Sequence, residues 1–226
     1  MKKAKNYFSD AQKQQIEAAI TEAENNTSGE IVTVVASASG RYDRAEDVFG
    51  VLFAMISLSI VWLYSQQITS IEGQWEEQIT AVITLPYVLG IIFLGFIVGA
   101  WLATFFPMLR LFFISKTEMQ QEVDRKALEA FHQFRIRGTQ GATGVLIFVS
   151  LYEHSVRVLG DKAINDQLTQ QDWEQVCGLV VEGMKRKQPT EKLIEAIDLC
   201  GQLLAEHFPI AEDDENELSN TLQLID

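Results

Sequence analysis

Two long stretches without charged residues lie in the first half of this chain, and they constrain its fold more than any other feature. Val48–Ile71 carries no charge, and its run Val48–Ser65 is almost wholly apolar. A second uncharged stretch, Gln78–Leu109, has its apolar centre near Leu85–Phe106. A bilayer core about 30 Å thick needs roughly 20 apolar residues of helix, so both runs are long enough to span it.

We therefore predict a transmembrane hairpin over residues 48–107, with spans at about 48–65 and 84–106. The alternative is a pair of buried core helices, but core helices of a small domain usually carry a charged edge. A signal peptide is a poorer explanation, because the first run begins only at residue 48, after a polar segment already patterned for folding.

The charges beside the two spans predict their orientation. The connection 66–80 holds Glu72, Glu76 and Glu77 and has neither Lys nor Arg. Basic residues lie instead before the first span and after the second: Lys2, Lys3, Lys5, Arg41 and Arg44, then Arg110, Lys116, Arg125 and Lys126. Since short cytoplasmic flanks are enriched in Lys and Arg, we expect both termini in the cytoplasm.

Composition limits the rest of the chain to an ordinary folded domain. The chain has 226 residues, 47% of them apolar and 22% charged, which excludes disordered, collagen-like and disulfide-scaffold classes. Its 18 Lys and Arg against 31 Asp and Glu give a formal charge of -13. Such a chain would be repelled by a polyanion, so we expect no nucleic-acid partner.

The residues on either side of the hairpin are patterned as parts of one domain. In the first part, 1–47, a capped amphipathic helix is followed by a strand at Glu30–Ala36. One helix and one strand cannot bury their faces alone, so their partners must lie beyond the hairpin. In the second part, 108–210, a helix starting at Thr117 precedes the apolar strand Gly144–Leu151 and a second strand, Ser155–Leu159.

Two further capped helices close the second part, one starting after Thr169 and the last after Gln188–Pro189. This order predicts an α/β fold, a small three-layer α/β/α sandwich of about three strands and four helices. The transmembrane hairpin is inserted after the first strand. Residues 211–226 carry six acids and no base, so we interpret them as a solvated acidic tail, disordered or serving as a docking segment.

Candidate site residues are few. Asp161 and Asp166 flank a short helical stretch directly after the last predicted strand, and strand ends are where open α/β sheets bind ligands. Both carboxylates could reach a hard cation such as Ca²⁺, which takes six or more oxygen ligands. Asp161 could instead cap the following helix. We interpret Cys177 and Cys200 as small residues of the protein core, in a protein that lies in a reducing compartment.

Two further charged residues are candidates for partner binding. Glu30 opens the first strand, where it is either an anchor for a partner or metal or a solvated edge charge. Arg157 is among the main cationic residues outside the spans. The sequence has no P-loop, dinucleotide-binding glycine motif or G-x-S-x-G elbow, so the catalytic residues of an enzyme stay unknown.

Five short segments, in this order, resemble the TPM domain of thylakoid-lumen phosphatase-like proteins and many bacterial membrane proteins. The last two resemble its membrane-embedded bacterial branch. The segments are Phe8-Ser9-Asp10, Ser28–Val32, Thr143–Ile147 followed by Val156–Val158, Gly160–Ile164 followed by Trp173, and Phe208-Pro209. They cover most of the chain outside the spans and the acidic tail.

This resemblance implies an α/β/α sandwich in the bacterial inner membrane. It also implies calcium binding, found in some members, and an acid phosphatase activity proposed for plant members. Many members have Asp-Asn-Gly before the central strand, where this chain has Ala142-Thr143-Gly144. The wider resemblance further suggests a LemA-like membrane protein as a partner.

Two functions from different classes remain open at this point. The first is a multi-pass membrane protein whose cytoplasmic TPM-like domain is an interaction or scaffold module. The alternative is a phosphatase-like hydrolase, calcium-dependent or using carboxylates near Asp161 to polarise a phosphate ester. The absence of a nucleophile motif and of an acid before Gly144 favours the first.

Overall fold

A computed structural model shows that the chain forms two compact units. One, here called the α/β unit, combines Met1–Gly40 with Thr117–Asp226; the other, the hairpin unit, is Arg41–Lys116. The structure describes residues 3–69, 78–81, 84–106, 112–211 and 214–226. The predicted fold class, a mixed α/β fold interrupted after its first strand by two long apolar helices, is confirmed.

The elements of the α/β unit begin largely where their capping residues predict. Ser9 and Gln12 form a capping box at the start of α1, and Thr169 and Asp172 form another at the start of α7. The elements are η1 (Ala4–Asn6), α1 (Asp10–Glu24), β1 (Glu30–Ala36), α5 (Lys116–Gln133), η2 (Ile136–Gly138), β4 (Gly144–Ser150), β5 (Ser155–Gly160), α6 (Lys162–Gln167), α7 (Gln170–Arg186), α8 (Pro189–His207) and β6 (Gln223–Ile225).

Strands from both sides of the hairpin join in one sheet, with the order β5-β4-β1-β6. β1 pairs in parallel with β4, so that Ile31 lies beside Val145 and Val35 beside Val149. Every residue of β1 and β4 is buried, as expected for central strands covered on both faces. β4 pairs antiparallel with β5, the next strand along the chain.

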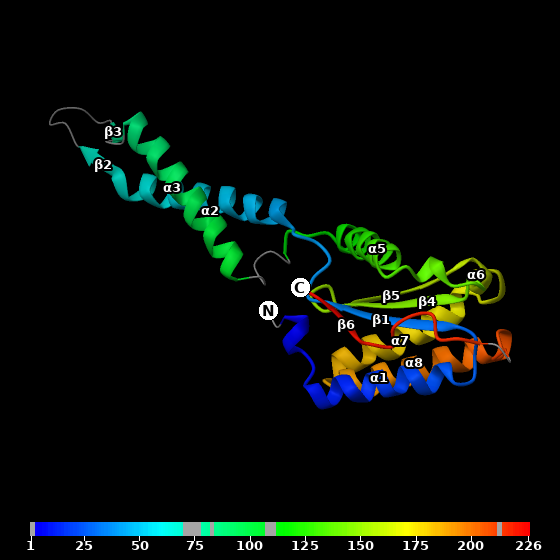
Figure 1. The fold of residues 1–226 in the computed structure, drawn as a ribbon. Helices are drawn as coiled ribbons and strands as arrows, with labels where there is room; N and C mark the ends of the chain where they lie inside the picture. Colours follow the sequence, from blue (N-terminus) through cyan, green and yellow to red (C-terminus); the bar gives the residue numbers. More distant parts are fainter. Residues whose placement is uncertain (1–2, 70–77, 82–83, 107–111, 212–213) are drawn as a thin grey trace. The chain divides into compact units, whose positions relative to one another are not determined.

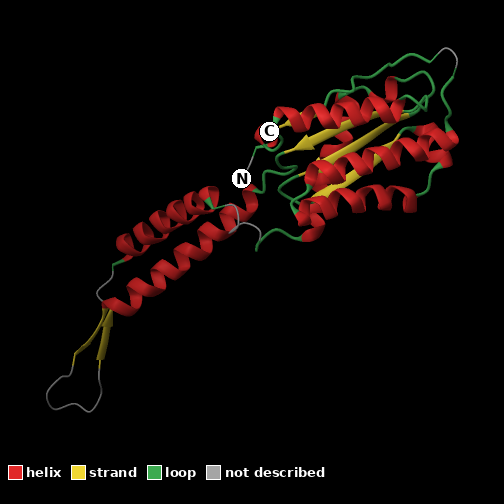
Figure 2. Cartoon of the chain, turned by 90° about the horizontal axis from the view of Figure 1, so that it is seen from below, coloured by secondary structure: helices red, strands yellow, loops and turns green. Residues whose placement is uncertain are grey.

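Helices cover the two faces of this sheet unequally. Figure 1 shows α1, α7 and α8 on one side of the strands and α5 on the other. Figure 2 shows that the helices run roughly along the strands. The first face forms the larger core, which includes Ile147 and Trp173. The second core is smaller and joins Phe131 of α5 to Phe148 of β4.

For the tail at 211–226, predicted to be either disordered or a docking segment, the last residues are docked on the sheet and are not a disordered tail. Gln223–Ile225 forms β6, which pairs in parallel with β1 and adds a fourth strand to the three that we predicted. Leu222 is 5% exposed, and the Ser37 hydroxyl donates to the carboxylate of Asp226. Acidic composition misled the prediction, because the acids concentrate before residue 218 and the end of the chain alternates Leu and polar residues.

The hairpin unit consists of two long helices, α2 (Asp43–Ser65) and α3 (Leu85–Phe105), with a two-stranded ribbon of β2 (Gln66–Thr69) and β3 (Gln78–Ala81) between them. At 23 and 21 residues, the helices are about 34 and 32 Å long and apolar enough to cross a membrane. α2 begins five residues before the predicted span. Glu72, Glu76 and Glu77 of the connection, and Arg110 beyond α3, lie outside the described residues.

Small residues form the contact between α2 and α3. A Cβ atom built on Gly99 would lie 2.7 Å from Cβ of Phe53 and 2.9 Å from Cα of Gly50. One built on Gly95 would lie 2.9 Å from Cα of Ala54. The helices therefore approach so closely that side chains larger than hydrogen do not fit at these glycines, the small-x-x-x-small pattern of membrane helix pairs.

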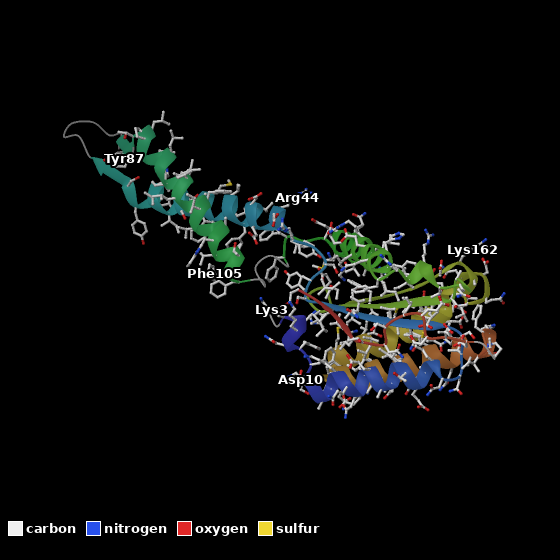
Figure 3. All side chains as sticks on the ribbon, viewed as in Figure 1. Lys3, Asp10, Arg44, Tyr87, Phe105 and Lys162 are labelled. Atoms are coloured by element: carbon white, nitrogen blue, oxygen red, sulfur yellow. The ribbon has the colours of Figure 1, made fainter. Side chains whose placement is uncertain are left out.

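Large apolar side chains point outward from the same two helices. Leu63 and Leu85 are 69% and 70% exposed, and Figure 3 shows side chains, the labelled Tyr87 and Phe105 among them, projecting away from the helices. A soluble protein buries such residues inside and exposes polar ones. The hairpin unit has the reverse arrangement, with its smallest residues inside and its largest apolar residues outside.

Candidate functional site

A cavity of about 400 Å³ opens in the α/β unit beside α5, at the end of β5. It follows from the unequal covering of the sheet. A sheet of four strands spaced about 4.8 Å apart is wider than a single helix, whose diameter is roughly 10 Å. The helix α5 alone therefore leaves part of this face of the sheet uncovered. The cavity lies over this part, between α5 and α6.

The cavity has an apolar floor and a charged rim. Leu128 and Phe131 of α5 and Leu159 of β5 form the apolar part. The polar lining residues come from α5, from η2, and from α6 with its N-cap residue: His132, Arg137, Asp161, Lys162, Asn165 and Asp166. One of them, Lys162, can be found by its label in Figure 3. Both aspartates that the sequence singled out therefore line one cavity.

Asp161 is 7% exposed and is held by backbone contacts on both sides. Its carboxylate accepts a hydrogen bond from the Lys162 amide at 2.7 Å, and its own amide donates to the carbonyl of Gly144 at 2.8 Å. It is thus the N-cap residue of α6. The guanidinium of Arg137 lies 3.9 Å from the same carboxylate oxygen, although most of the Arg137 side chain is exposed.

The two carboxylates of this cavity are not part of a larger cluster of candidate metal ligands in the described part of the chain. Asp166 is exposed, and no described group of three or more His, Cys, Asp or Glu side chains is close enough to hold a metal. A cation, Arg137, already faces Asp161, which further disfavours a second cation there. Calcium binding and phosphate hydrolysis stay predictions of the resemblance.

Glu30 and Arg157 lie apart from this cavity, and each is engaged inside the unit. Glu30 is 6% exposed, and its carboxylate accepts hydrogen bonds from the amides of Glu217 and Leu218. Burial is the main cause that raises its pKa. Arg157 forms an ion pair with Asp124 of α5. Glu30 thus anchors the C-terminal segment, and Arg157 joins β5 to the helix that covers it.

Sequence reasoning missed Glu24, the last residue of α1. Burial, with a smaller contribution from the nearby charge of Glu30, raises the pKa of its carboxyl group to about 7. The sequence contains one signal that could have found it. Ile16 and Ile20 form the buried stripe of α1, and Glu24 follows Ile20 by four residues, so it continues the same face.

Comparison with known proteins identifies the fold. No family model and no curated protein matches the sequence. The structure is similar to the NMR structure of the BA42 protein from the psychrophilic bacterium Bizionia argentinensis, with a TM-score of 0.56 and 21% sequence identity over 99% of each chain. At this identity the similarity establishes a shared fold, and it assigns no activity.

Proposed function

We propose that this chain is a multi-pass inner-membrane protein of the TPM type, in which the hairpin unit spans the bilayer and the α/β unit is a cytoplasmic interaction module. The proposal rests on the arrangement of α2 and α3, which place small residues at their contact and large apolar side chains on their outer surface. Their outward Leu, Ile and Phe side chains would cost roughly 1.5 to 3 kcal/mol each if they stayed in water, and a lipid environment removes this cost. Both helices match the length of a bilayer core.

Reporter fusions test the membrane topology. Green fluorescent protein fused after Asp226 is expected to fluoresce, and alkaline phosphatase fused at the same site is expected to be inactive, because the positive-inside rule places this end in the cytoplasm. The matched control inserts the same reporters after Thr69, in the connection between the helices, where the two activities are expected to reverse. Alkaline phosphatase activity in the fusion after Asp226 would contradict the proposed topology.

The cavity beside α5 supports the second half of the proposal. The volume of the cavity suits a small molecule or a few protruding side chains of a partner. Arg137 and Lys162 add two cations at its rim. Apolar anchors within a charged surround are typical of protein interfaces. From the resemblance to the TPM domain, we propose a LemA-like membrane protein as the partner.

Co-purification tests this partner. The LemA-like protein is expected to be recovered with the full chain in mild detergent, and at least about tenfold less of it with the double variant Arg137→Glu and Lys162→Glu, because a fully desolvated charge contact is worth 1.4 kcal/mol or more. The matched control is Lys185→Glu with Lys187→Glu, which reverses two exposed cations of the last turn of α7 and its C-cap. Equal recovery with both double variants would show that the cavity is not the contact surface.

A further inference from the structure

The last thirteen residues, 214–226, run along the open edge of β1 and are here called the strap. Only three of them pair with β1, at its carboxyl end. Around this pairing, the Leu222 side chain is buried, the Ser37 amide donates to the carbonyl of Ile225 at 2.8 Å, and Lys5 pairs with Asp226 at 3.6 Å. The strap therefore covers part of a strand edge that would otherwise leave its backbone groups unpaired.

Carboxylates from α1 and β1 bind backbone amides of the strap ahead of its pairing with β1. The two oxygens of Glu30 accept the amides of Glu217 and Leu218 at 3.0 and 3.2 Å. A carboxylate of α1, Glu17, accepts the amide of Leu222 at 3.1 Å. The strap itself is acidic, so each anchor also brings a negative charge toward a negatively charged segment.

Glu24 lies at the centre of this arrangement. Its carboxyl oxygen accepts the Ile31 amide of β1 at 2.8 Å, on the strand edge where the strap passes. The groups that interact with it are Glu30 of β1, Asp214 and Asn220 of the strap, and Cys200 of α8. Burial raises the pKa of the Cys200 thiol to about 12, so this neighbour stays neutral. Within the described residues, the charged groups that act on Glu24 are the acids Glu30 and Asp214.

We propose that the strap is a proton-sensitive latch, closed over β1 while Glu24 is neutral and released when Glu24 ionises. A neutral Glu24 leaves Glu30 as the main buried charge, stabilised by its two amide donors. Ionisation places a second buried negative charge beside Glu30 and Asp214. Release of the strap admits water to these carboxylates and uncovers the backbone donors and acceptors of the β1 edge.

The direction of the pH effect follows from proton linkage. With the strap closed, the pKa of Glu24 is about 7, whereas the ordinary value is 4.5. Between these values the closed form binds more protons than the open form, so closure is most stable below about pH 4.5 and weakens as the pH rises to 7. If opening restores the ordinary pKa, the open population increases by about twentyfold between about pH 5.5 and about pH 7.5.

Hydrogen exchange of the full chain in detergent micelles tests the latch. After correction for intrinsic exchange rates, the protection of amides in residues 217–225 is expected to fall by about twentyfold between about pH 5.5 and about pH 7.5, while that of β4 amides stays constant. The variant Glu24→Gln keeps an acceptor for the Ile31 amide and cannot ionise. Its strap is expected to stay protected at both pH values.

The control variant is Glu22→Gln, which removes one exposed carboxylate from the same helix and is expected to behave as the parent. Two results would overturn the proposal. One is equal strap protection of the parent chain at both pH values. The other is a pH effect in Glu24→Gln as large as that in the parent, which would assign the effect to other groups. The comparison of strap with β4 in the parent holds even if a variant fails to fold.

Discussion

Replacing Gly99 by leucine is expected to separate α2 from α3. The new Cβ atom alone would lie 2.7 Å from Cβ of Phe53 and 2.9 Å from Cα of Gly50, closer than such atoms approach in real structures. One of these contacts is to backbone, so a change of side-chain rotamer cannot relieve it. The helix pair would have to open along its length, at a cost of about 3 kcal/mol or more.

A disulfide across the helix pair measures this effect. The hydroxyl of Thr104 donates to the carboxylate of Glu46 at 3.0 Å, so Glu46→Cys with Thr104→Cys places two thiols at facing positions of α2 and α3. Mild oxidation is expected to link them in the parent background and at least about tenfold less efficiently with Gly99→Leu. The matched control is Gly90→Leu on the same helix, because a Cβ atom at Gly90 meets nothing within 4 Å. Equal linking in both variants would contradict the close packing.

Replacing Phe148 by alanine is expected to destabilise the α/β unit by about 3 to 5 kcal/mol. Phe148 is fully buried in β4, beside Val34 of β1, and it packs in the core beneath α5. Truncation removes the packing of the ring against its buried neighbours. It leaves a cavity that these close-packed neighbours fill only in part. The loss is of the same order as the whole stability of many domains.

Urea unfolding of the full chain in micelles, followed by hydrogen exchange of β4 amides, measures this loss. Leu128→Ala is the matched control, since Leu128 lies on α5 above the same face and is 51% exposed. Its effect is expected to stay below about 1 kcal/mol. If Phe148→Ala unfolded at the same urea concentration as the control, β4 would not be the central strand of a shared core.

Features with a local physical cause could be predicted from the sequence. The two membrane-length helices follow from continuous apolar runs, and the starts of α1 and α7 follow from capping boxes. β4 follows from a run of apolar residues that is typical of a strand covered on both faces. The reunion of β1 with β4 across the hairpin was also predictable. A lone helix and strand have exposed apolar faces and need partners further along the chain.

The strand β6 could not be predicted from local pattern. It has only three residues, and its acidic neighbours gave the segment the composition of a disordered tail. The segment before it is held by Glu30, whose carboxylate accepts the amide of Glu217 from 187 positions along the chain. A pairing between distant residues leaves no periodic signal in either segment.

The sequence by itself determined that two apolar helices interrupt one α/β domain, because the periodicity of apolar residues and the length of an apolar run are properties of neighbouring residues. Only the tertiary structure decided which charged groups face one another. It brought Asp161 and Arg137 to one cavity, and it enclosed Glu24 between α1, the edge of β1 and the strap. The environment of a carboxylate depends on groups that folding brings near, and these groups come from distant parts of the chain.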